Sequence, residues 1–265
     1  MTDRPIENLR NQGFCLLPDL LPAQEVLEAR DLCDREWQDF GRRGQRWFGG
    51  GMILGHINYA PPPDLALFGR WITHPAILGS IEALLGKEAA LLSWGGNLNI
   101  PGSAFQPPHT DGLMDTRYLI VNVPLDDVDE TNGSTEIYPG SHLKRMSYKE
   151  FQRDFRKRAV RTNSRAGDVV IRYPNLWHRG TPNRSARPRM MLGAIFGPQN
   201  PEAQPIRLDE SNNAAFRSAG VGGRIAVVEA GPGSFTQNYF APTVKGITKE
   251  LLCRHAPGLY SLMRR

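Results

Sequence analysis

The residues best suited to chemistry are His109 and Asp111, which stand two positions apart in the chain. Residues at positions i and i+2 of an extended strand project from the same face, so this imidazole and this carboxylate can bind one metal ion together. The preceding segment, residues 95–108, reads as a strand followed by a Pro/Gly turn. We therefore expect the pair at the end of a strand, where it supplies half of a metal site.

His178 is the best candidate for a third ligand. It ends the β-rich run 169–178, which follows a glycine turn and predicts a strand that carries the imidazole at its end. Two histidines and one carboxylate form a facial triad, which leaves coordination positions open and is typical of non-haem Fe(II) oxygenases. The sequence therefore predicts an Fe(II) site at His109, Asp111 and His178.

Arg189 begins the apolar run 189–196 and could bind a carboxylate. The planar guanidinium makes two parallel charge-assisted hydrogen bonds to a carboxylate and keeps its charge when desolvated. A metal triad followed by such an arginine suggests 2-oxoglutarate as co-substrate. Arg187 and Arg184 are close alternatives, and either Asn97 or Asn99, on the strand that approaches the triad, could donate a hydrogen bond to the keto acid group.

Several segments together resemble the phytanoyl-CoA dioxygenase family of Fe(II)/2-oxoglutarate oxygenases, and the resemblance covers most of the chain. They are the opening Gly13–Leu21, the His-x-Asp triplet, the acidic turn and Pro-Gly-Ser-His loop of Asp126–His142, and the closing Trp177–Gly180 and Arg187–Arg189. The resemblance implies Fe(II), 2-oxoglutarate and dioxygen chemistry, with the metal ligands and the 2-oxoglutarate arginine at His109, Asp111, His178 and Arg189. It does not fix the substrate, because similar members hydroxylate acyl thioesters, amino acids, sugars and polyketides.

The elements that must position these residues predict a mainly β fold with flanking helices, a double-stranded β-helix or jelly roll of the cupin type. Helical spacing of apolar residues is found over 22–40 and 75–86, and shorter helices are expected over 147–158 and 248–264. Strands separated by Pro, Gly and Asn turns are expected near 89–100, 117–125, 134–138, 168–173 and 189–197. The metal would lie in the mouth of this jelly roll.

Two long stretches without periodicity, about 41–64 and 199–242, are expected to form lids over the site. The first contains the residues that we expect to contact substrate, namely Arg46, Trp47, Phe48, His56 and Asn58. His142 is expected to have a structural role, and His56, His74 and His255 are not expected to bind the metal.

The composition is that of an ordinary globular enzyme, with 265 residues, 40% hydrophobic and 22% charged, and we expect one domain over 1–265. Cys15, Cys33 and Cys253 lack the spacing of a disulfide framework or a zinc motif. The net charge of +5 is a mild excess, and the basic clusters do not alternate with aromatic residues as a nucleic-acid groove would. No apolar run is long enough to span a bilayer, and no signal peptide is visible. We therefore expect a cytoplasmic protein with a small-molecule substrate and no nucleic-acid or membrane partner, and the oligomeric state stays open.

These features together predict a 2-oxoglutarate-dependent dioxygenase that hydroxylates an unactivated C–H bond of a small-molecule metabolite, such as a secondary metabolite, sugar or acyl compound. Desaturation or ring closure would use the same residues, whereas halogenation is disfavoured because Asp111 fills the position that a halide would need. One alternative is a jelly-roll binding or regulatory protein without turnover. Another is a zinc-type metal hydrolase, for which Glu136 is the candidate acid/base. Succinate formation from 2-oxoglutarate would distinguish the oxygenase from both.

Overall fold

Two β-sheets carry the fold of the computed structural model, which describes residues 4–38, 47–49, 54–59, 66–111, 118–198, 226–227, 251–252, 255–256 and 259. The large sheet contains, in spatial order, β1 (Phe14–Leu17), β8 (Val169–Arg172), β5 (Leu119–Pro124), β10 (Arg189–Pro198), β4 (Ala89–Asn99), β3 (His56–Tyr59) and β2 (Trp47–Gly49). These strands pair antiparallel, and β11 (Ala226–Val227) runs parallel to β4. The small sheet has the order β7 (Val160–Arg161), β6 (Glu136–Ile137) and β9 (His178–Arg179).

The chain passes back and forth between the two sheets. After β4 the segment 101–111 runs beside β9, where the backbone groups of His109 and His178 exchange two hydrogen bonds of 2.9 Å. The chain returns to the large sheet for β5, crosses again for β6 and β7, and repeats the alternation through β8, β9 and β10. This is the connectivity of a jelly roll, so the fold class predicted from the sequence is confirmed.

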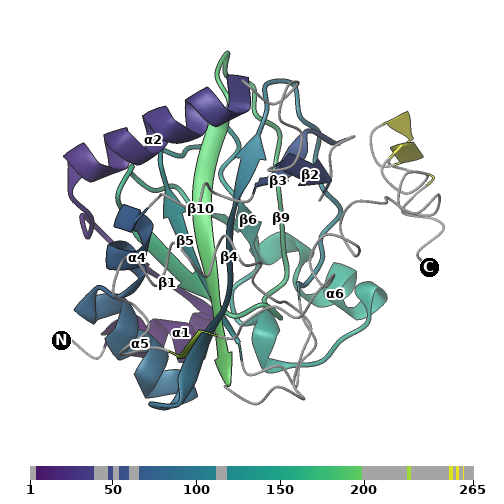
Figure 1. Cartoon of the computed structure of the whole chain (residues 1–265). Helices are drawn as coiled ribbons and strands as arrows, with labels where there is room; N and C mark the ends of the chain where they lie inside the picture. Colours follow the sequence, from purple (N-terminus) through teal and green to yellow (C-terminus); the bar gives the residue numbers. More distant parts are fainter. Residues whose placement is uncertain are drawn as a thin grey trace, which may run out of the picture.

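Helices cover the outer face of the large sheet, while the small sheet lies on its other side (Figure 1). The helices on the outer face are α1 (Arg4–Gln12), α2 (Ala23–Gln38), α4 (Ala66–Ile72) and α5 (Pro75–Leu85). A shorter helix, α6 (Tyr148–Asp154), packs Phe151 against Trp177 beside the small sheet, with a ring-centroid distance of 4.2 Å. Within the described part of the chain, no helix has the length and apolarity needed to cross a bilayer.

The main core lies between these helices and the large sheet. Alternate residues of β10 enter it, and the buried set from this strand is Met190, Leu192, Ala194 and Phe196. Each large apolar side chain buried in this way contributes about 1.5–3 kcal/mol. Because side chains alternate between the faces of a strand, the intervening residues point toward the small sheet. Arg189, the first residue of β10, therefore belongs to the inner face, where the jelly roll can hold a site.

Most of the predicted elements are confirmed with small changes at their ends. The helix predicted over 22–40 spans Ala23–Gln38, and the helix predicted over 75–86 ends at Leu85 with Gly86 as its C-cap. The predicted strand 134–138 shortens to Glu136–Ile137, and the charged helix over 147–158 ends at Asp154 before a separate 3₁₀ turn. Helices α1 and α4 were not predicted, and the helix expected over 248–264 lies mostly outside the described residues.

The stretch 41–64, expected to form a loop, contains β2 and β3, which extend the large sheet beyond β4. Part of the stretch that was expected to form a lid loop is therefore β-sheet, and the expectation is wrong for β2 and β3. Strands of three and four residues are too short to show a clear alternation in the sequence. Of the second expected lid, 199–242, the structure describes only β11. Lid closure by the remaining residues of both stretches stays a prediction.

Candidate functional site

The three predicted metal ligands lie together between the two sheets. His109 and His178 are held side by side by their paired backbones, and the Asp111 N–H donates to the Pro174 carbonyl at 2.8 Å. One potential ligand atom from each side chain lies within 4.8 Å of the others. His178 is buried, whereas His109 and Asp111 have side chains about one third exposed, at 31% and 36%. The group can therefore hold one cation and can still be reached from outside.

Hydrogen bonds to backbone carbonyls fix both imidazole rings. Nδ1 of His109 lies 2.8 Å from the Pro107 oxygen, and Nδ1 of His178 lies 2.9 Å from the Leu176 oxygen. A carbonyl only accepts, so each Nδ1 carries the proton and each Nε2 presents a lone pair. The Nε2 atoms of His109 and His178 lie 3.7 and 3.4 Å from the Asp111 carboxylate oxygens. Metal-binding histidines commonly have their second ring nitrogen fixed in this way.

The electrostatics of the site favour a neutral His178 and an ionised Asp111. Burial lowers the pKa of His178 to about 3, and the nearby charge of Arg172 acts in the same direction. Burial alone would raise the pKa of Asp111, but its electrostatic interactions with His178, Arg172 and His109 and the hydrogen bond from Arg172 outweigh burial and hold this pKa below its usual range. These are the protonation states that metal ligands need.

Arg172, for which the sequence suggested no role, binds the Asp111 carboxylate directly. Its Nη2 donates to Oδ2 at 2.6 Å, and its side chain is mostly buried. The arginine fixes one carboxylate oxygen and leaves the other free for a metal. A signal was present in the sequence: Val169 and Ile171 are core residues, so alternation along β8 places Arg172 on the inner face.

Arg189 lies on the inner face with a guanidinium that is almost fully buried, at 3% exposure. Its Nη2 donates to the Gly133 carbonyl at 3.4 Å, whereas Nε and Nη1 are buried and find no partner among the described residues. Burial lowers the pKa of Arg189 to about 10, so the group keeps its charge at neutral pH. Buried donors without partners cost free energy, which a bound anion would recover. The alternatives Arg184 and Arg187 are exposed.

His56 and Asn99 lie in one row with Arg189 across β3, β4 and β10. Asn99 is fully buried and its amide donates to the Thr181 carbonyl at 2.9 Å. His56 is also buried, with Nε2 at 2.8 Å from the Ala104 oxygen, and burial lowers its pKa to about 4. The structure thus places His56, expected in a lid, and Asn99, expected near the keto acid group, next to the guanidinium that would bind the distal carboxylate.

The other residues predicted to contact substrate or the keto acid group lie further along the sheet or outside the described residues. Asn97 on β4 and Asn58 on β3 are paired opposite each other, two residues along from the pair Asn99 and His56, and both are half-buried. Trp47 and Phe48 belong to the edge strand β2, with Phe48 opposite Asn58, and Arg46 lies outside the described residues. His142 is structural, as expected, and contacts the Arg10 carbonyl, whereas His74 caps α5 and is not part of the group of potential metal ligands.

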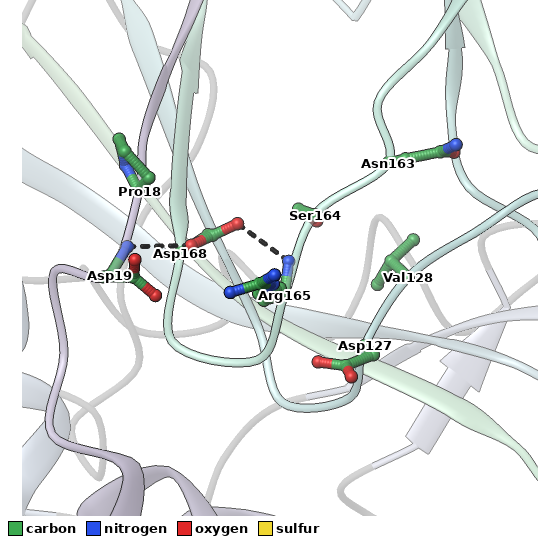
Figure 2. Close-up of a pocket in the computed structure, with 8 residues that line it drawn as sticks. All are labelled: Pro18, Asp19, Asp127, Val128, Asn163, Ser164, Arg165 and Asp168. Atoms are coloured by element: carbon green, nitrogen blue, oxygen red, sulfur yellow. Dashed lines mark hydrogen bonds between the residues drawn. The ribbon is translucent and has the colours of Figure 1, made fainter.

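A hollow of about 420 Å³ lies at the opposite end of β8 from Arg172. Its carboxylates hold loops together, because Asp168 accepts from the backbone N–H groups of Asp19 and Arg165 at 2.9 and 2.7 Å (Figure 2). Asp127 likewise accepts from the Ala166 N–H at 2.9 Å. This hollow is therefore separate from the candidate metal centre, and its acidic groups have structural roles.

Residues 9–191 match the family model described as phytanoyl-CoA dioxygenase (PhyH). The chain belongs to the phytanoyl-CoA dioxygenase family. The resemblance that the sequence motifs indicated is thereby confirmed. The matched region includes His109, Asp111, His178 and Arg189, so all four residues lie in the part of the chain that defines the family.

Solved structures share this fold at low sequence identity. The epimerase SnoN, in complex with Fe3+, alpha ketoglutarate and nogalamycin RO, is 23% identical over 74% of this chain and 83% of its own, with a TM-score of 0.59. The carbocyclase SnoK from nogalamycin biosynthesis is 22% identical over 75% and 84%, with a TM-score of 0.57. HygX from Streptomyces hygroscopicus, with nickel and 2-oxoglutarate bound, is 16% identical over 78% and 95%, with a TM-score of 0.59. At these identities the likeness establishes the jelly-roll fold.

Proposed function

We propose that the chain is an Fe(II)- and 2-oxoglutarate-dependent oxygenase that oxidises a C–H bond of a small-molecule metabolite. The observation that carries this proposal is the combination, inside one jelly roll, of a pre-oriented His109–Asp111–His178 group and the buried guanidinium of Arg189, two of whose donors have no partner among the described residues. The first feature suits a metal, and the second suits a carboxylate. Similar structures with Fe3+ and alpha ketoglutarate, or with nickel and 2-oxoglutarate, support the same assignment.

The donor set fits Fe(II). Two imidazole nitrogens and one carboxylate oxygen are the ligands of the facial triad, which leaves positions for a co-substrate and dioxygen. Both rings already have the tautomer that a metal requires, because their Nδ1 atoms bond to carbonyls. Metal binding would therefore need little reorganisation of His109 and His178.

The inner face of the large sheet fits 2-oxoglutarate. The distal carboxylate of this acid would bond to Nε and Nη1 of Arg189, the two donors that have no partner in the described part of the protein. Asn99 and His56 would form the walls of this end of the pocket. Asn97, two residues further along β4, is the better candidate for a contact to the keto acid group.

When bound, iron and 2-oxoglutarate supply the oxidising chemistry, in which the co-substrate is converted to succinate and carbon dioxide. The protein's own residues hold the geometry. Backbone carbonyls orient the two imidazoles, and Arg172 orients the carboxylate of Asp111. The inner face is half-buried and therefore partly shielded from water, which strengthens each of these polar contacts.

Within this chemistry we propose hydroxylation as the outcome at the substrate carbon. The similar structures include an epimerase, a carbocyclase and a monooxygenase, so the shared fold is compatible with several outcomes. Product analysis by mass spectrometry separates them, because hydroxylation adds one oxygen atom, cyclisation or desaturation removes two hydrogens, and epimerisation leaves the mass unchanged.

The structure weighs against the hydrolase alternative. Glu136 is opposite Arg179, which follows His178 on β9, so it lies on the other face of the small sheet from the metal ligand. Its carboxylate is bound by Arg179 Nε at 2.7 Å and accepts from the Tyr138 hydroxyl at 2.5 Å. Glu136 therefore cannot serve as the acid/base at the metal. The binding-protein alternative does not account for a metal triad combined with a buried guanidinium that has two donors without a partner among the described residues.

The test is succinate formation by purified protein in air with Fe(II) and 2-oxoglutarate, with and without a panel of candidate metabolites. We expect succinate from the parent protein and its stimulation by compounds close to the true substrate. Asp111→Ala is the matched control for iron chemistry that does not involve the site. If the parent protein forms no more succinate than Asp111→Ala under any of these conditions, the proposed function is wrong.

A further inference from the structure

The buried face of α2 carries a charged residue, Arg30, which is 5% exposed. A buried guanidinium destabilises the fold unless it is paired and hydrogen-bonded. Arg30 forms an ion pair with Asp34 in the next turn of the helix and donates from Nε to Oδ1 of Asp126 at 2.7 Å. The Arg30–Asp126 pair joins α2 to the segment that follows β5.

This pair holds the two peptide groups that flank the Cα atom of Arg189. Nη2 of Arg30 donates to the Pro188 carbonyl at 3.1 Å, and the Met190 N–H donates to Oδ2 of Asp126 at 2.7 Å. Met190 points into the core beneath the helices, whereas the side chain of Arg189 points to the inner face. The ion pair therefore holds the backbone from one side of the sheet, and the guanidinium of Arg189 is presented on the other.

The position needs this support because the sheet ends here. β5 ends at Pro124, and the bond from the Leu125 N–H to the Met190 carbonyl, at 3.0 Å, follows directly after it. The Met190 N–H then bonds to the Asp126 side chain in place of a strand partner. On the other side, Arg189 is opposite Asn99, the last residue of β4. Strand ends open more easily than strand centres.

We propose that Arg30 and Asp126 are positioning residues that direct the Arg189 guanidinium and so make the protein selective for a 2-oxo acid with a distal carboxylate. The inference rests on the proposed function, because it takes Arg189 as the residue that binds 2-oxoglutarate. It adds a specific role for a helix–sheet contact that is remote from the metal.

Asp126 also acts through its charge. Both of its oxygens are engaged, by Arg30 and by the Met190 N–H, so it does not occupy the donors of Arg189. Its negative charge nevertheless favours the charged form of Arg189 and opposes the effect of burial on the pKa of that group. Asp126 thus favours the charged guanidinium without occupying Nε and Nη1, which have no partner among the described residues.

The experiment compares the affinities of two acids for anaerobic Fe(II)-loaded protein, followed by the metal-to-ligand charge-transfer band. 2-Oxoglutarate and 2-oxobutanoate share the keto acid group, but only 2-oxoglutarate has a distal carboxylate. In Asp126→Asn and Arg30→Met, we expect the affinity for 2-oxoglutarate to fall about ten- to hundredfold, the usual scale for a displaced binding group. The affinities for 2-oxobutanoate and Fe(II) should stay at the parent values. Arg30→Lys should recover part of the loss, because an ammonium can pair with Asp126 but lacks the forked donor geometry of a guanidinium.

Glu25→Gln provides the matched control. Glu25 also fastens α2, through bonds from Trp71 Nε1 at 2.6 Å and Arg70 Nη2 at 2.9 Å, but it does not contact the Arg189 backbone. This variant should lower the melting temperature without changing the preference for 2-oxoglutarate. A further check is the double variant Arg189→Ala/Asp126→Asn, which should bind 2-oxoglutarate no more weakly than Arg189→Ala alone.

The inference is overturned if Asp126→Asn and Arg30→Met keep the parent preference for 2-oxoglutarate, or if they weaken both acids equally. Should either variant fail to fold, Arg30→Lys gives the same comparison, and an unchanged preference there also overturns the inference. A parent protein that binds neither acid would instead show that the proposed function is wrong. That outcome is distinct, because it appears before any variant is compared.

Discussion

Arg172 donates from Nη2 to Oδ2 of Asp111 at 2.6 Å and thereby ties the end of β8 to the carboxylate of the candidate metal centre. The same Oδ2 atom lies 3.4 Å from Nε2 of His178. Arg172 is mostly buried, whereas the Asp111 side chain is about one third exposed, so the contact is only partly shielded from water. The arginine therefore sets the orientation in which Asp111 meets a metal.

Arg172→Met should reduce Fe(II) affinity or succinate formation by about ten- to hundredfold, the usual effect of removing a group that orients a metal ligand. Arg172→Lys should retain part of the function, because it keeps the charge but loses the planar fork. Isothermal titration with Fe(II) under anaerobic conditions, together with the succinate assay, measures both effects. Arg165→Met, at the other end of β8, is the control and should resemble the parent. If Arg172→Met keeps the Fe(II) affinity and the succinate formation of the parent, Arg172 does not orient Asp111 for metal binding.

Arg189→Ala should weaken 2-oxoglutarate binding far more than Fe(II) binding. Removing one partner of a desolvated ion pair typically costs about 3–5 kcal/mol. At about 1.4 kcal/mol for each factor of ten, this is a loss on the order of a hundredfold or more. Arg189→Lys should recover only part of it, because an ammonium cannot make the two-pronged contact.

Arg187→Ala is the matched control for this prediction, because Arg187 lies two residues away but is exposed. It should bind 2-oxoglutarate almost normally in the same titration. If Arg187→Ala were the impaired variant and Arg189→Ala the normal one, the carboxylate would have to bind elsewhere than on the inner face of β10.

Gly133→Ala should destabilise the protein and crowd the Arg189 pocket. Gly133 has φ of +90°, and a Cβ atom there would lie 2.2 Å from Nδ2 of Asn99 and 2.8 Å from the Thr181 oxygen. The backbone strain alone costs about 1–3 kcal/mol. Gly102→Ala is the control, since Gly102 has φ of +75° but a Cβ atom there would meet nothing within 4 Å, so it carries the strain without the collision. Urea unfolding and 2-oxoglutarate titration should show the larger stability loss, and the only loss of affinity, in Gly133→Ala.

The stability of the metal-free protein should fall as the pH is lowered from about 6.5 to about 4, in part through His56. Burial lowers the pKa of His56 from 6.5 to about 4, so in this window the unfolded chain takes up a proton that the folded protein does not. The stability from neutral His56 is complete above pH 6.5. At about 1.4 kcal/mol per pKa unit, the contribution lost at low pH is at most about 3.5 kcal/mol.

Urea unfolding at several pH values, for the parent and for His56→Gln, measures this contribution. The other buried histidines titrate in both proteins, so the difference between the two curves isolates His56. The variant should be less stable at neutral pH but should lose less stability on acidification. Parallel curves for the two proteins would show that His56 is not held neutral by the fold.

The sequence predicted best those elements whose local pattern agrees with their packing. α2 and α5 show apolar residues at helical spacing, and β10 is a long apolar run, so their existence and approximate ends could be read directly. The three metal ligands lie together as predicted, but His109 forms an isolated bridge and Asp111 a bend, so the expected strand end is not what positions the pair. Arg189 was predicted from its place at the start of the apolar run and from the family resemblance, and burial, which the sequence does not show, separates it from the exposed Arg184 and Arg187.

What the sequence could not show depends on contacts between distant segments. The row of His56, Asn99 and Arg189 exists only because β3 and β10 flank β4, and β3 is too short to be recognised by its own pattern. Arg30 occupies the buried face of α2, which the helical period would have allowed, but a charged residue is normally assigned to solvent. Its partner Asp126 is far away in sequence, so nothing local marked the pair as buried.

Titration of 2-oxoglutarate into anaerobic Fe(II)-loaded protein tests the proposed site most directly, because the metal-to-ligand charge-transfer band appears only when the keto acid chelates the iron. We predict a saturable band in the parent protein, and its absence in Asp111→Ala, whose melting temperature should stay close to that of the parent. A band of parental intensity and affinity in Asp111→Ala, or no band in the parent protein after Fe(II) loading, would contradict the assignment of His109, Asp111 and His178 as the iron ligands.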